Sequence, residues 1–380
     1  MRTLLSSILF TVWIFAAPPT AAFVPGGALS TRTALRMAAV ESNDPDALMP
    51  TAQAAQTVAV AGATGKLGQC VVKELIKRNV SNIVCLVRST DKAQNVWGKT
   101  PPRNLKIVPC DLSDEKALQK ALNGVDAALW CATGFSPSTS WVERLQKLFG
   151  LATQQPSIDT VGLPLLAKAL PQKKNTTYPR VVMCSSAGVT RPQWTDDKKE
   201  RLVGAAEIPI VRLNPFGILD IKLASEDTLR DSNVPYCIVR PSGLNDEWPA
   251  GSRPLLSQGD VAVGRICRAD VATVMVDVLS APEAVGKTFE VTAVADYPPP
   301  RSLRPVLRRL VSDGTPLDET AVTATYQVLQ QLLPGEKQAA NELAMGQTYE
   351  QLDKGETGRF GKRGEENLNE VPMQPSSGIR

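Results

Sequence analysis

Three closely spaced glycines directly follow the apolar run 57–61 and precede a run with helical periodicity, residues 69–78. In a strand–turn–helix unit, the first glycine turns the chain, the second admits a pyrophosphate, and the third lets the helix pack closely. The first turn of the helix also offers unpaired N–H groups to an anion. The pattern predicts a dinucleotide phosphate site, with an ordinary glycine turn as the alternative. The residues expected at this site are Gly62, Thr64, Gly65, Lys66, Leu67 and Gly68.

An arginine, Arg88, comes directly after the second apolar run, residues 82–87. An acidic residue at this position would bind the ribose 2′-hydroxyl of NAD, whereas an arginine can pair with the 2′-phosphate of NADP. The position therefore predicts NADP as the cofactor, with NAD as the second choice. A solvated arginine at a strand end is the alternative.

Polar or small residues also follow the third and fourth apolar runs, residues 105–109 and 127–132. In an open α/β sheet, ligands bind outside the carboxyl ends of the strands. We expect Asp111 to accept a hydrogen bond from the adenine amino group or to cap the helix that begins near Asp114. The small residues after the fourth run let the chain pass close to the nicotinamide ribose. The expected contacts are Asp111, Leu112, Ala132, Thr133 and Gly134.

Alternating strand-like and helix-like runs must position these residues, and they extend from residue 57 to about residue 294. This alternation predicts an α/β fold of the Rossmann type, a doubly wound parallel sheet covered by helices on both faces. The expected strands are 57–61, 82–87, 105–109, 127–132, 180–185, 236–240 and 288–294. The expected helices are 66–78, 114–122, 160–170, 217–232 and 270–279.

Composition excludes several classes of function. The chain has no histidine, which removes Ser-His-Asp hydrolysis and histidine-ligated zinc. It carries 42 basic and 38 acidic residues, and three of the arginines precede the first acid, Glu41, so the remainder is nearly neutral. This balance gives no support for nucleic-acid binding. The seven cysteines form no Cys-x-x-Cys pair, which predicts buried thiols in a reducing compartment and no metal site.

The N-terminal residues have the composition of targeting segments. Residues 1–22 contain an arginine, an apolar stretch and small residues, the layout of a cleavable signal peptide. Residues 23–40 contain arginine and hydroxyl side chains but no acid, as transit peptides do. The junction around Phe23 resembles the bipartite plastid presequence of algae with secondary plastids. The resemblance implies a stromal or plastid-membrane-associated protein, whereas plain secretion is the alternative.

The order of motifs along residues 56–294 resembles one family. The glycine turn, Arg88 and Asp111 are followed by further motifs at residues 185–188, 239–244 and 268–272. Together they resemble the atypical short-chain dehydrogenase/reductase family, and within it the NmrA-like NAD(P)-binding proteins of plastids and cyanobacteria. The resemblance implies a Rossmann-fold NAD(P)(H) site and, in many relatives, hydride transfer.

The resemblance also implies a catalytic arrangement, in which a tyrosine four positions before a lysine acts as acid and base and a serine ends the fifth strand. Lys222 matches the lysine, and Ser185 or Ser186 matches the serine. Ile218 stands at the tyrosine position and cannot transfer a proton. Lys222 is then a ribose contact, a desolvated general base or a surface lysine, in that order of preference. The candidate substitute acids are Asp220, Asp246 and Glu247.

Other segments surround or follow the expected dinucleotide-binding domain, residues 56–297. We expect a helical extension at 301–334, whose arginine-rich start suits an anionic membrane surface or an acidic partner, or else caps the body. The tail 335–380 is rich in charge and glycine, which predicts disorder. The loop 134–155, with Trp141, is expected to cover the nicotinamide side or to pack on the body.

Two functions of different classes fit these features. The first is an NADP(H)-binding oxidoreductase of the plastid that acts on an unidentified small molecule. The second is a non-catalytic protein that uses the dinucleotide as a structural or redox-sensing ligand while it aids assembly, import or expression of photosynthetic complexes. Ile218 and the short segment 243–263, where relatives build the substrate pocket, favour the second, and the cofactor site fits both.

Overall fold

The computed structural model describes residues 50–133, 157–173, 176–214 and 217–332, together with residues 355 and 357. The chain divides into two compact units, and the described residues all belong to the second, Asp46–Arg380. Three segments with predictions fall wholly or almost wholly outside the described residues: 1–40, 134–155 and 335–380.

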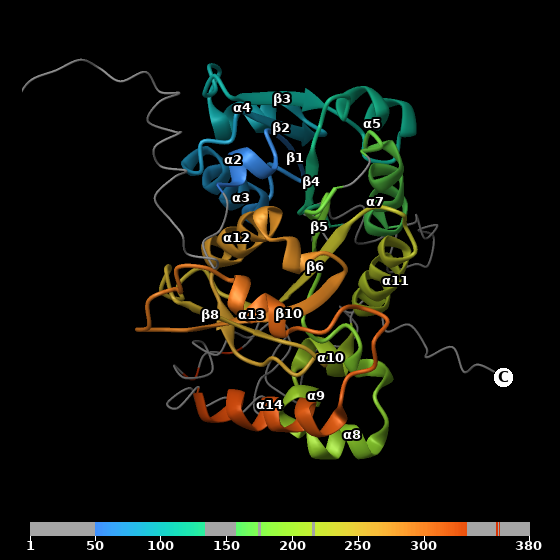
Figure 1. The fold of residues 1–380 in the computed structure, drawn as a ribbon, viewed down its shortest axis with the longest axis vertical. Helices are drawn as coiled ribbons and strands as arrows, with labels where there is room; N and C mark the ends of the chain where they lie inside the picture. The colour runs from blue at the N-terminus through green and yellow to red at the C-terminus, as the bar shows by residue number, and fades with distance from the viewer. Residues whose placement is uncertain are drawn as a thin grey trace, which may run out of the picture. The chain divides into compact units, whose positions relative to one another are not determined.

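An eight-stranded sheet forms the body of this unit, in the order β3-β2-β1-β4-β5-β6-β10-β8 (Figure 1). Neighbouring strands pair in parallel except β8, which is antiparallel to β10. The strand order reverses between β1 and β4, and such a reversal opens a ligand-binding crevice at the carboxyl ends. The predicted doubly wound α/β fold is therefore confirmed. The strands are β1 (Thr57–Ala61), β2 (Asn82–Val87), β3 (Leu105–Pro109), β4 (Ala127–Trp130), β5 (Val181–Cys184), β6 (Tyr236–Pro241), β8 (Arg253–Ser257) and β10 (Lys287–Val294).

Helices cover both faces of the sheet (Figure 1). On one face, α3 (Lys66–Lys77) packs against α12 (Arg268–Asp277), and their apolar residues join one buried cluster with the strands. On the other face, α7 (Ile158–Ala169) packs against α5 (Glu115–Ala121) and α11 (Ile218–Arg230), above a second cluster. All five lie within about two residues of their predicted bounds. The helix α3 presents an apolar face at helical spacing, whereas α12 is buried nearly all round.

Several elements were not expected from the sequence. Three short helices follow β5, and an extra helix lies between β2 and β3. The edge strand β8 contains Pro254, which lacks the N–H that an interior strand needs, so the run does not resemble a strand. The unexpected helices are α2 (Thr51–Ala54), α4 (Thr90–Trp97), α8 (Asp196–Arg201), α9 (Val203–Ala206) and α10 (Pro209–Leu213). The remaining short strands are β7 (Gly243–Leu244) and β9 (Arg265–Ile266).

Two helices, α13 (Arg304–Arg309) and α14 (Glu319–Leu332), follow the last strand of the sheet. In α13, Arg304 pairs with Glu283 at 2.8 Å, and the carbonyl of the buried Leu307 accepts a hydrogen bond from the Lys287 ammonium at 2.7 Å. These contacts attach α13 to the body, which favours the alternative in which the arginine-rich stretch caps the body. Proline at the first turn also limits α13 to a short helix.

The helix α14 packs on the short helices α8 and α9 at the lower end of the view in Figure 1. Its Tyr326 hydroxyl accepts a hydrogen bond from the Gly204 amide at 3.2 Å, and its Val322 and Leu329 join a small buried cluster with Trp194. The C-terminal helix thereby holds the segment that follows β5.

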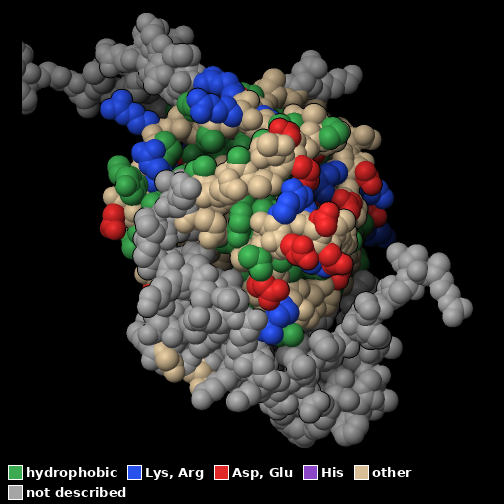
Figure 2. All heavy atoms as spheres, turned by 90° about the horizontal axis from the view of Figure 1, so that it is seen from below, with side chains coloured by type: hydrophobic (Ala, Val, Ile, Leu, Met, Phe, Trp, Pro, Cys, Tyr) green, Lys and Arg blue, Asp and Glu red, His purple; other side chains and the backbone are tan. Residues whose placement is uncertain are grey.

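Charges of both signs occur on the surface of the described residues. On the face in Figure 2, basic side chains gather at one edge and acidic side chains at another, with uncharged surface between them. Neither sign dominates this face, in agreement with the near-neutral balance of the sequence. Among the described helices, none combines the length and the apolarity that a membrane crossing requires.

Candidate functional site

The turn between β1 and α3 is a cradle that only small residues can form. Gly62 has a positive φ of 78°, and a Cβ added there would lie 2.7 Å from the backbone nitrogen of Ala132. A Cβ on Gly68 would overlap the Gly62 carbonyl oxygen. Gly65, at the N-cap of α3, is exposed, and a Cβ added there would lie 3.2 Å from the Gly62 carbonyl oxygen. The first and third glycines thus allow the tight turn and the close packing of the helix.

The amino end of α3 carries no side-chain cap. The Gly65 amide bonds to the Gly62 carbonyl at 2.9 Å, and the first bond of the helix runs from the Gln69 amide to Gly65 at 2.9 Å. The amides of the first turn, at Lys66, Leu67 and Gly68, have no partner one turn earlier in the helix. An anion such as a pyrophosphate can accept from these N–H groups.

Arg88 and Asp111 line one cavity of about 370 Å³ at the carboxyl ends of β2 and β3. Arg88 is exposed and lies directly after β2. Hydrogen bonds from Ser113 lower the pKa of Asp111, with a smaller contribution from the charge of Arg88. The cavity therefore combines a cation for a phosphate with an ionised acceptor for an adenine amino group.

The capping role considered for Asp111 belongs to a different residue. Asp114 is the N-cap of α5 and accepts hydrogen bonds from the Lys116 and Ala117 amides. Asp111 instead accepts from the Ser113 amide at 2.9 Å and from its hydroxyl at 2.7 Å. Asp111 is thus held in a turn whose outer side faces the cavity.

The other residues expected at the cofactor site lie at the same edge. The side chain of Leu112 is buried in the core, so only its backbone is available to a ligand. Ala132 is half-buried beside Gly62, and Thr133 is exposed and engaged in a contact of its own. Thr64 is half-buried, and its carbonyl accepts from Gln69 at 3.1 Å. Gly134 lies outside the described residues.

Lys222 lies inside the protein at the switch point of the sheet. Only 9% of the residue is exposed, and its Nζ is 3.7 Å from Oδ1 of Asp159. Burial raises the pKa of Cys184, at the end of β5, to about 11, and the charge of Lys222 partly offsets this rise. Lys222 therefore lies near the carboxyl end of β5, and the surface-lysine interpretation is wrong.

A residue that the sequence did not single out, Asp159, holds Lys222. Asp159 is 2% exposed in the first turn of α7, and its Oδ1 accepts a hydrogen bond from Trp130 Nε1 at 3.0 Å. A buried ammonium needs such a partner, because removal of either group of a buried ion pair leaves the other charge uncompensated. An aspartate at a helix start suggests a cap, so only the packing of α7 on α11 identifies this role.

Ser185 is buried at the end of β5, and its hydroxyl has no hydrogen-bond partner among the described residues. The neighbouring Ser186 hydroxyl donates to the Ala187 carbonyl. Burial raises the pKa of Glu226, but the charges of Arg240 and Arg230 more than offset this and hold it below its ordinary value. Glu226 accepts from Arg240 Nε at 2.9 Å and from Arg230 at 2.8 Å. The Ser185 hydroxyl is thus a buried polar group without a partner in the described part of the chain, apart from this ionic network.

The three candidate substitute acids do not contact Lys222 within the described part of the chain. Asp220 is exposed and accepts from Asn214 at 2.6 Å, and Asp246 pairs with Arg268 at 2.6 Å. Glu247 is exposed in the turn after β7, where its amide donates to the Asn245 side-chain oxygen. The arrangement can bind and orient a dinucleotide, but no described acid stands in for the tyrosine that Ile218 replaces.

The cysteines are buried or half-buried, and Cys110 lines the Arg88 cavity. Burial raises the pKa of Cys85 to about 12, and all seven side chains are free thiols. Among the described residues, no group of three or more His, Cys, Asp or Glu side chains could hold a metal ion.

Comparison with known proteins identifies the family. Residues 62–282, more than half of the chain, match the family model described as NAD(P)H-binding. An uncharacterized chloroplastic protein of Arabidopsis thaliana is 30% identical over 248 residues, covering 63% of this chain and 78% of that protein. The sanguinarine reductase of Eschscholzia californica is 27% identical, covering 62% and 88%. The chloroplastic protein TIC 62 of Arabidopsis thaliana is 27% identical, covering 63% of this chain and 36% of that protein.

The matched range begins at the first glycine of the turn and includes the Arg88 cavity, Asp159 and Lys222. The glycine cradle, the uncapped helix start and the order of strands agree with this match. The chain therefore belongs to the NAD(P)H-binding, NmrA-like group of the atypical short-chain dehydrogenase/reductase family.

Proposed function

We propose that this protein binds NADP(H), with the adenosine end in the Arg88–Asp111 cavity and the diphosphate at the start of α3. The observation that carries the proposal is the juxtaposition of this cavity with the glycine cradle at one edge of the sheet. The exposed Arg88 guanidinium offers the 2′-phosphate a bidentate partner, which NADH cannot use. The nicotinamide end would then extend toward Ala132 and Lys222.

We propose further that the protein is an oxidoreductase for a small acceptor that needs no proton from the enzyme. Bound NADPH would supply a hydride. Lys222, held by Asp159 at 3.7 Å, would orient the ribose with its ammonium. Because Ile218 cannot donate a proton, an acceptor such as an iminium carbon, which takes a hydride without protonation, suits the site better than a simple ketone. One relative is named for the reduction of sanguinarine, which makes that compound a suitable probe.

The second candidate is a non-catalytic protein that uses NADP(H) as a structural or redox-sensing ligand in plastid complex assembly, import or expression. A specific observation favours it: Lys222 is engaged by a buried acid, Asp159. Side chains committed to internal ion pairs can support a bound dinucleotide without performing proton transfer. A dinucleotide-dependent contact with a plastid protein complex would then be the activity.

Calorimetry and absorbance measurements on the purified protein separate these candidates. NADPH and NADH are titrated first, and NADPH oxidation is then followed with sanguinarine and with plastid extract. Oxidation that is lost in Lys222→Ala but kept in Lys168→Ala, an exposed lysine on α7, supports the oxidoreductase. Tight NADPH binding without oxidation supports the non-catalytic protein. Failure of both coenzymes to bind at about 1 mM would overturn both candidates.

We also propose that the protein works in the plastid of an alga with a secondary plastid. The composition of residues 1–40 and the chloroplastic relatives support this. A fluorescent protein fused behind residues 1–40 should accumulate in the plastid of such an alga. The same fusion with Phe23→Ala should stop before the plastid, and export of the unaltered fusion from the cell would contradict the proposal.

A further inference from the structure

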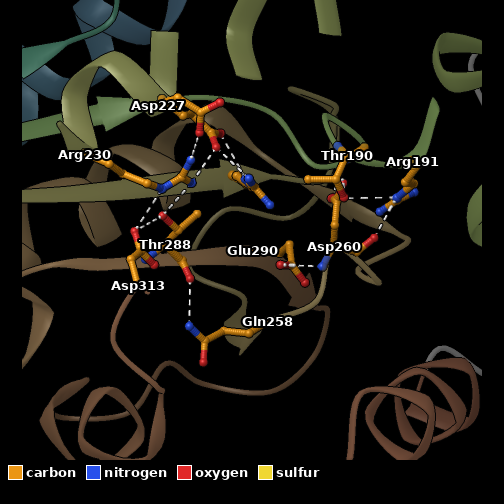
Figure 3. Close-up of polar contacts among 12 residues, drawn as sticks. Thr190, Arg191, Asp227, Arg230, Gln258, Asp260, Thr288, Glu290 and Asp313 are labelled. Atoms are coloured by element: carbon orange, nitrogen blue, oxygen red, sulfur yellow. Dashed lines mark hydrogen bonds and ion pairs between the residues drawn. The ribbon is translucent and has the colours of Figure 1, made fainter. Parts of the chain in front are cut away.

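A second cavity, of about 330 Å³, lies at the opposite end of the sheet and shares no lining residue with the Arg88 cavity. It is bounded by β6, β10 and the end of α11, and by the segments 258–260 and 311–317. In Figure 3, Arg230, Thr288 and Asp313 lie on one side, and Asp260 and Thr190 lie on the other. Its volume is at the lower end of the range for small-molecule sites.

The carboxylates that line this cavity are already engaged by donors of the protein. Asp313 accepts from the Thr288 amide and hydroxyl, Tyr236 and Arg230. Asp260 accepts from the amides of Gly188 and Thr190 and from the Thr190 hydroxyl. These carboxylate oxygens have little capacity left for a cationic ligand.

The third carboxyl group, Glu290, is also engaged. It accepts from the Asp260 and Val261 amides and from the Ser257 hydroxyl at 2.8 Å. Burial, followed by the nearby charge of Asp260, raises the pKa of Glu290, so this carboxyl group holds its proton more readily than a free glutamic acid. Three basic residues, Lys198, Arg230 and Arg240, line the same cavity.

Some hydrogen-bond donors that line the cavity, in contrast, remain available to a ligand. Arg240 is 6% exposed, and its Nε and Nη2 bind Glu226, whereas its Nη1 has no hydrogen-bond partner among the described residues. Among the described residues, the Lys198 ammonium bonds to Glu319 alone, at 3.0 Å, and lies over the Trp194 ring. An ammonium has three donors, so this one contact leaves capacity for a ligand. Ser312 lines the same cavity, and its hydroxyl makes no hydrogen bond in the described part of the chain.

From this imbalance of donors over acceptors, we infer that the cavity is a binding site for a small oxyanion, either a carboxylate or a phosphate group. The guanidinium of Arg240 is the innermost contact, and Lys198 and Ser312 are the outer ones. The site lies between α11, which carries Lys222, and the segment held by α14, so an occupant would join these two parts of the structure.

Two probes, inorganic phosphate and malonate, test the inference by calorimetry on the full chain. NADPH is present at saturation in a parallel series, because the cradle at α3 can itself bind phosphate. At least one probe should bind with a Kd of about 1 mM, with and without NADPH. Binding of phosphate alone identifies a phosphate site, and binding of malonate alone identifies a carboxylate site. Absence of binding by both probes, or binding that NADPH abolishes, overturns the inference.

Variants locate the bound probe. Lys198→Gln and Ser312→Ala should each weaken the probe about fivefold to tenfold, because each removes a donor to a charged group. Lys199→Gln is the matched control, since this neighbouring lysine of α8 does not line the cavity and pairs only with Asp196 in the described structure. Unchanged probe affinity in both Lys198→Gln and Ser312→Ala would place the anion elsewhere and reject the site.

The innermost contact needs a different design, because Arg240 also stabilises Glu226. Arg240→Lys keeps the positive charge but removes the free Nη1 donor, and it should weaken the probe about tenfold. If this variant fails to fold, the Lys198 and Ser312 variants still decide the question. NADPH affinity is measured in every variant and should stay within about twofold, since the two cavities share no residue.

Discussion

At the β1–β3 end of the sheet, the groups that face the crevice are backbone N–H groups and exposed side chains such as Arg88. At the β6–β10 end, they are buried side chains, including Arg240 and Glu290, which bind other side chains or the backbone. The first end is open for a ligand, and changes of its exposed side chains should affect the stability of the fold little. The second end stabilises the fold, so a change there affects stability before it affects binding.

The largest expected effect is on stability, at the buried end. Glu226→Gln removes the charge that Arg240 and Arg230 share, and it should lower the free energy of unfolding by about 3–5 kcal/mol in urea titrations. Glu200→Gln, on the exposed surface of α8, should change it by less than about 0.5 kcal/mol. Equal losses in both variants would contradict the contrast between the two ends.

The pH dependence of stability gives an independent check of the same ion pair. Burial raises the pKa of Glu226, but Arg240 more than offsets it, so the folded-state pKa lies below the ordinary 4.5. The unfolded chain then binds the proton more readily, and the stabilisation is present above pH 4.5 and is lost as pH falls through the folded-state value. In acid, the wild type should therefore lose stability more steeply than Glu226→Gln, and parallel curves would contradict this assignment.

The next effect is on coenzyme binding, at the open end. Gly62→Ala places a Cβ 2.7 Å from Ala132 in a left-handed conformation, and we expect NADPH affinity to fall by more than about 100-fold. Gly124→Ala is the matched control, because Gly124 also has a positive φ but has no atom within 4 Å of an added Cβ. Gly124→Ala should lower the free energy of unfolding by about 1–2 kcal/mol, and the folded variant should bind NADPH as tightly as the wild type. Calorimetry and urea titration measure the two quantities.

A smaller effect distinguishes the two coenzymes. Arg88→Ala removes the proposed partner of the 2′-phosphate and should weaken NADPH about 10-fold to 100-fold, while NADH stays within about twofold. Arg103→Ala, another exposed arginine, should alter neither affinity. An equal loss for both coenzymes in Arg88→Ala would reject the 2′-phosphate assignment.

The smallest effect concerns the pair at the switch point. Asp159→Asn leaves the Lys222 ammonium without its carboxylate and should weaken NADPH about fivefold by loosening its position. Because Asp159 acts through Lys222, the double variant with Lys222→Ala should bind NADPH no more weakly than Lys222→Ala alone. Additive losses would show that Asp159 affects the coenzyme by another route.

The open end could be predicted almost entirely from the sequence. The glycine turn, the helix after it and Arg88 depend on residues that are neighbours along the chain, and their spacing is set by the strand–turn–helix geometry. The cavity beside Arg88 and Asp111 agrees with that prediction, although the cap of α5 proved to be Asp114. Local patterns suffice here because the anion is to be bound by backbone groups of one short segment.

The buried end could not be predicted in this way. Glu226 and Arg240 lie on α11 and β6, Asp260 follows β8, and Asp313 comes from the segment before α14. Each is an ordinary charged residue in the sequence, and only the folded chain makes them partners. The same holds for Asp159, whose position in the first turn of α7 suggests a cap rather than a partner of Lys222.

The amino-acid sequence by itself determined the parallel α/β sheet, the glycine cradle and the absence of the tyrosine at position 218, since periodicity, glycine spacing and residue identity are local properties. Only the tertiary structure decided that Lys222 is buried against Asp159, that the arginine-rich stretch contributes a cap on the body, and that a second polar cavity exists. The reason is physical. Burial and ion pairing depend on which distant segments pack together. A charge that becomes buried needs a partner, and a segment far away in the sequence can supply it.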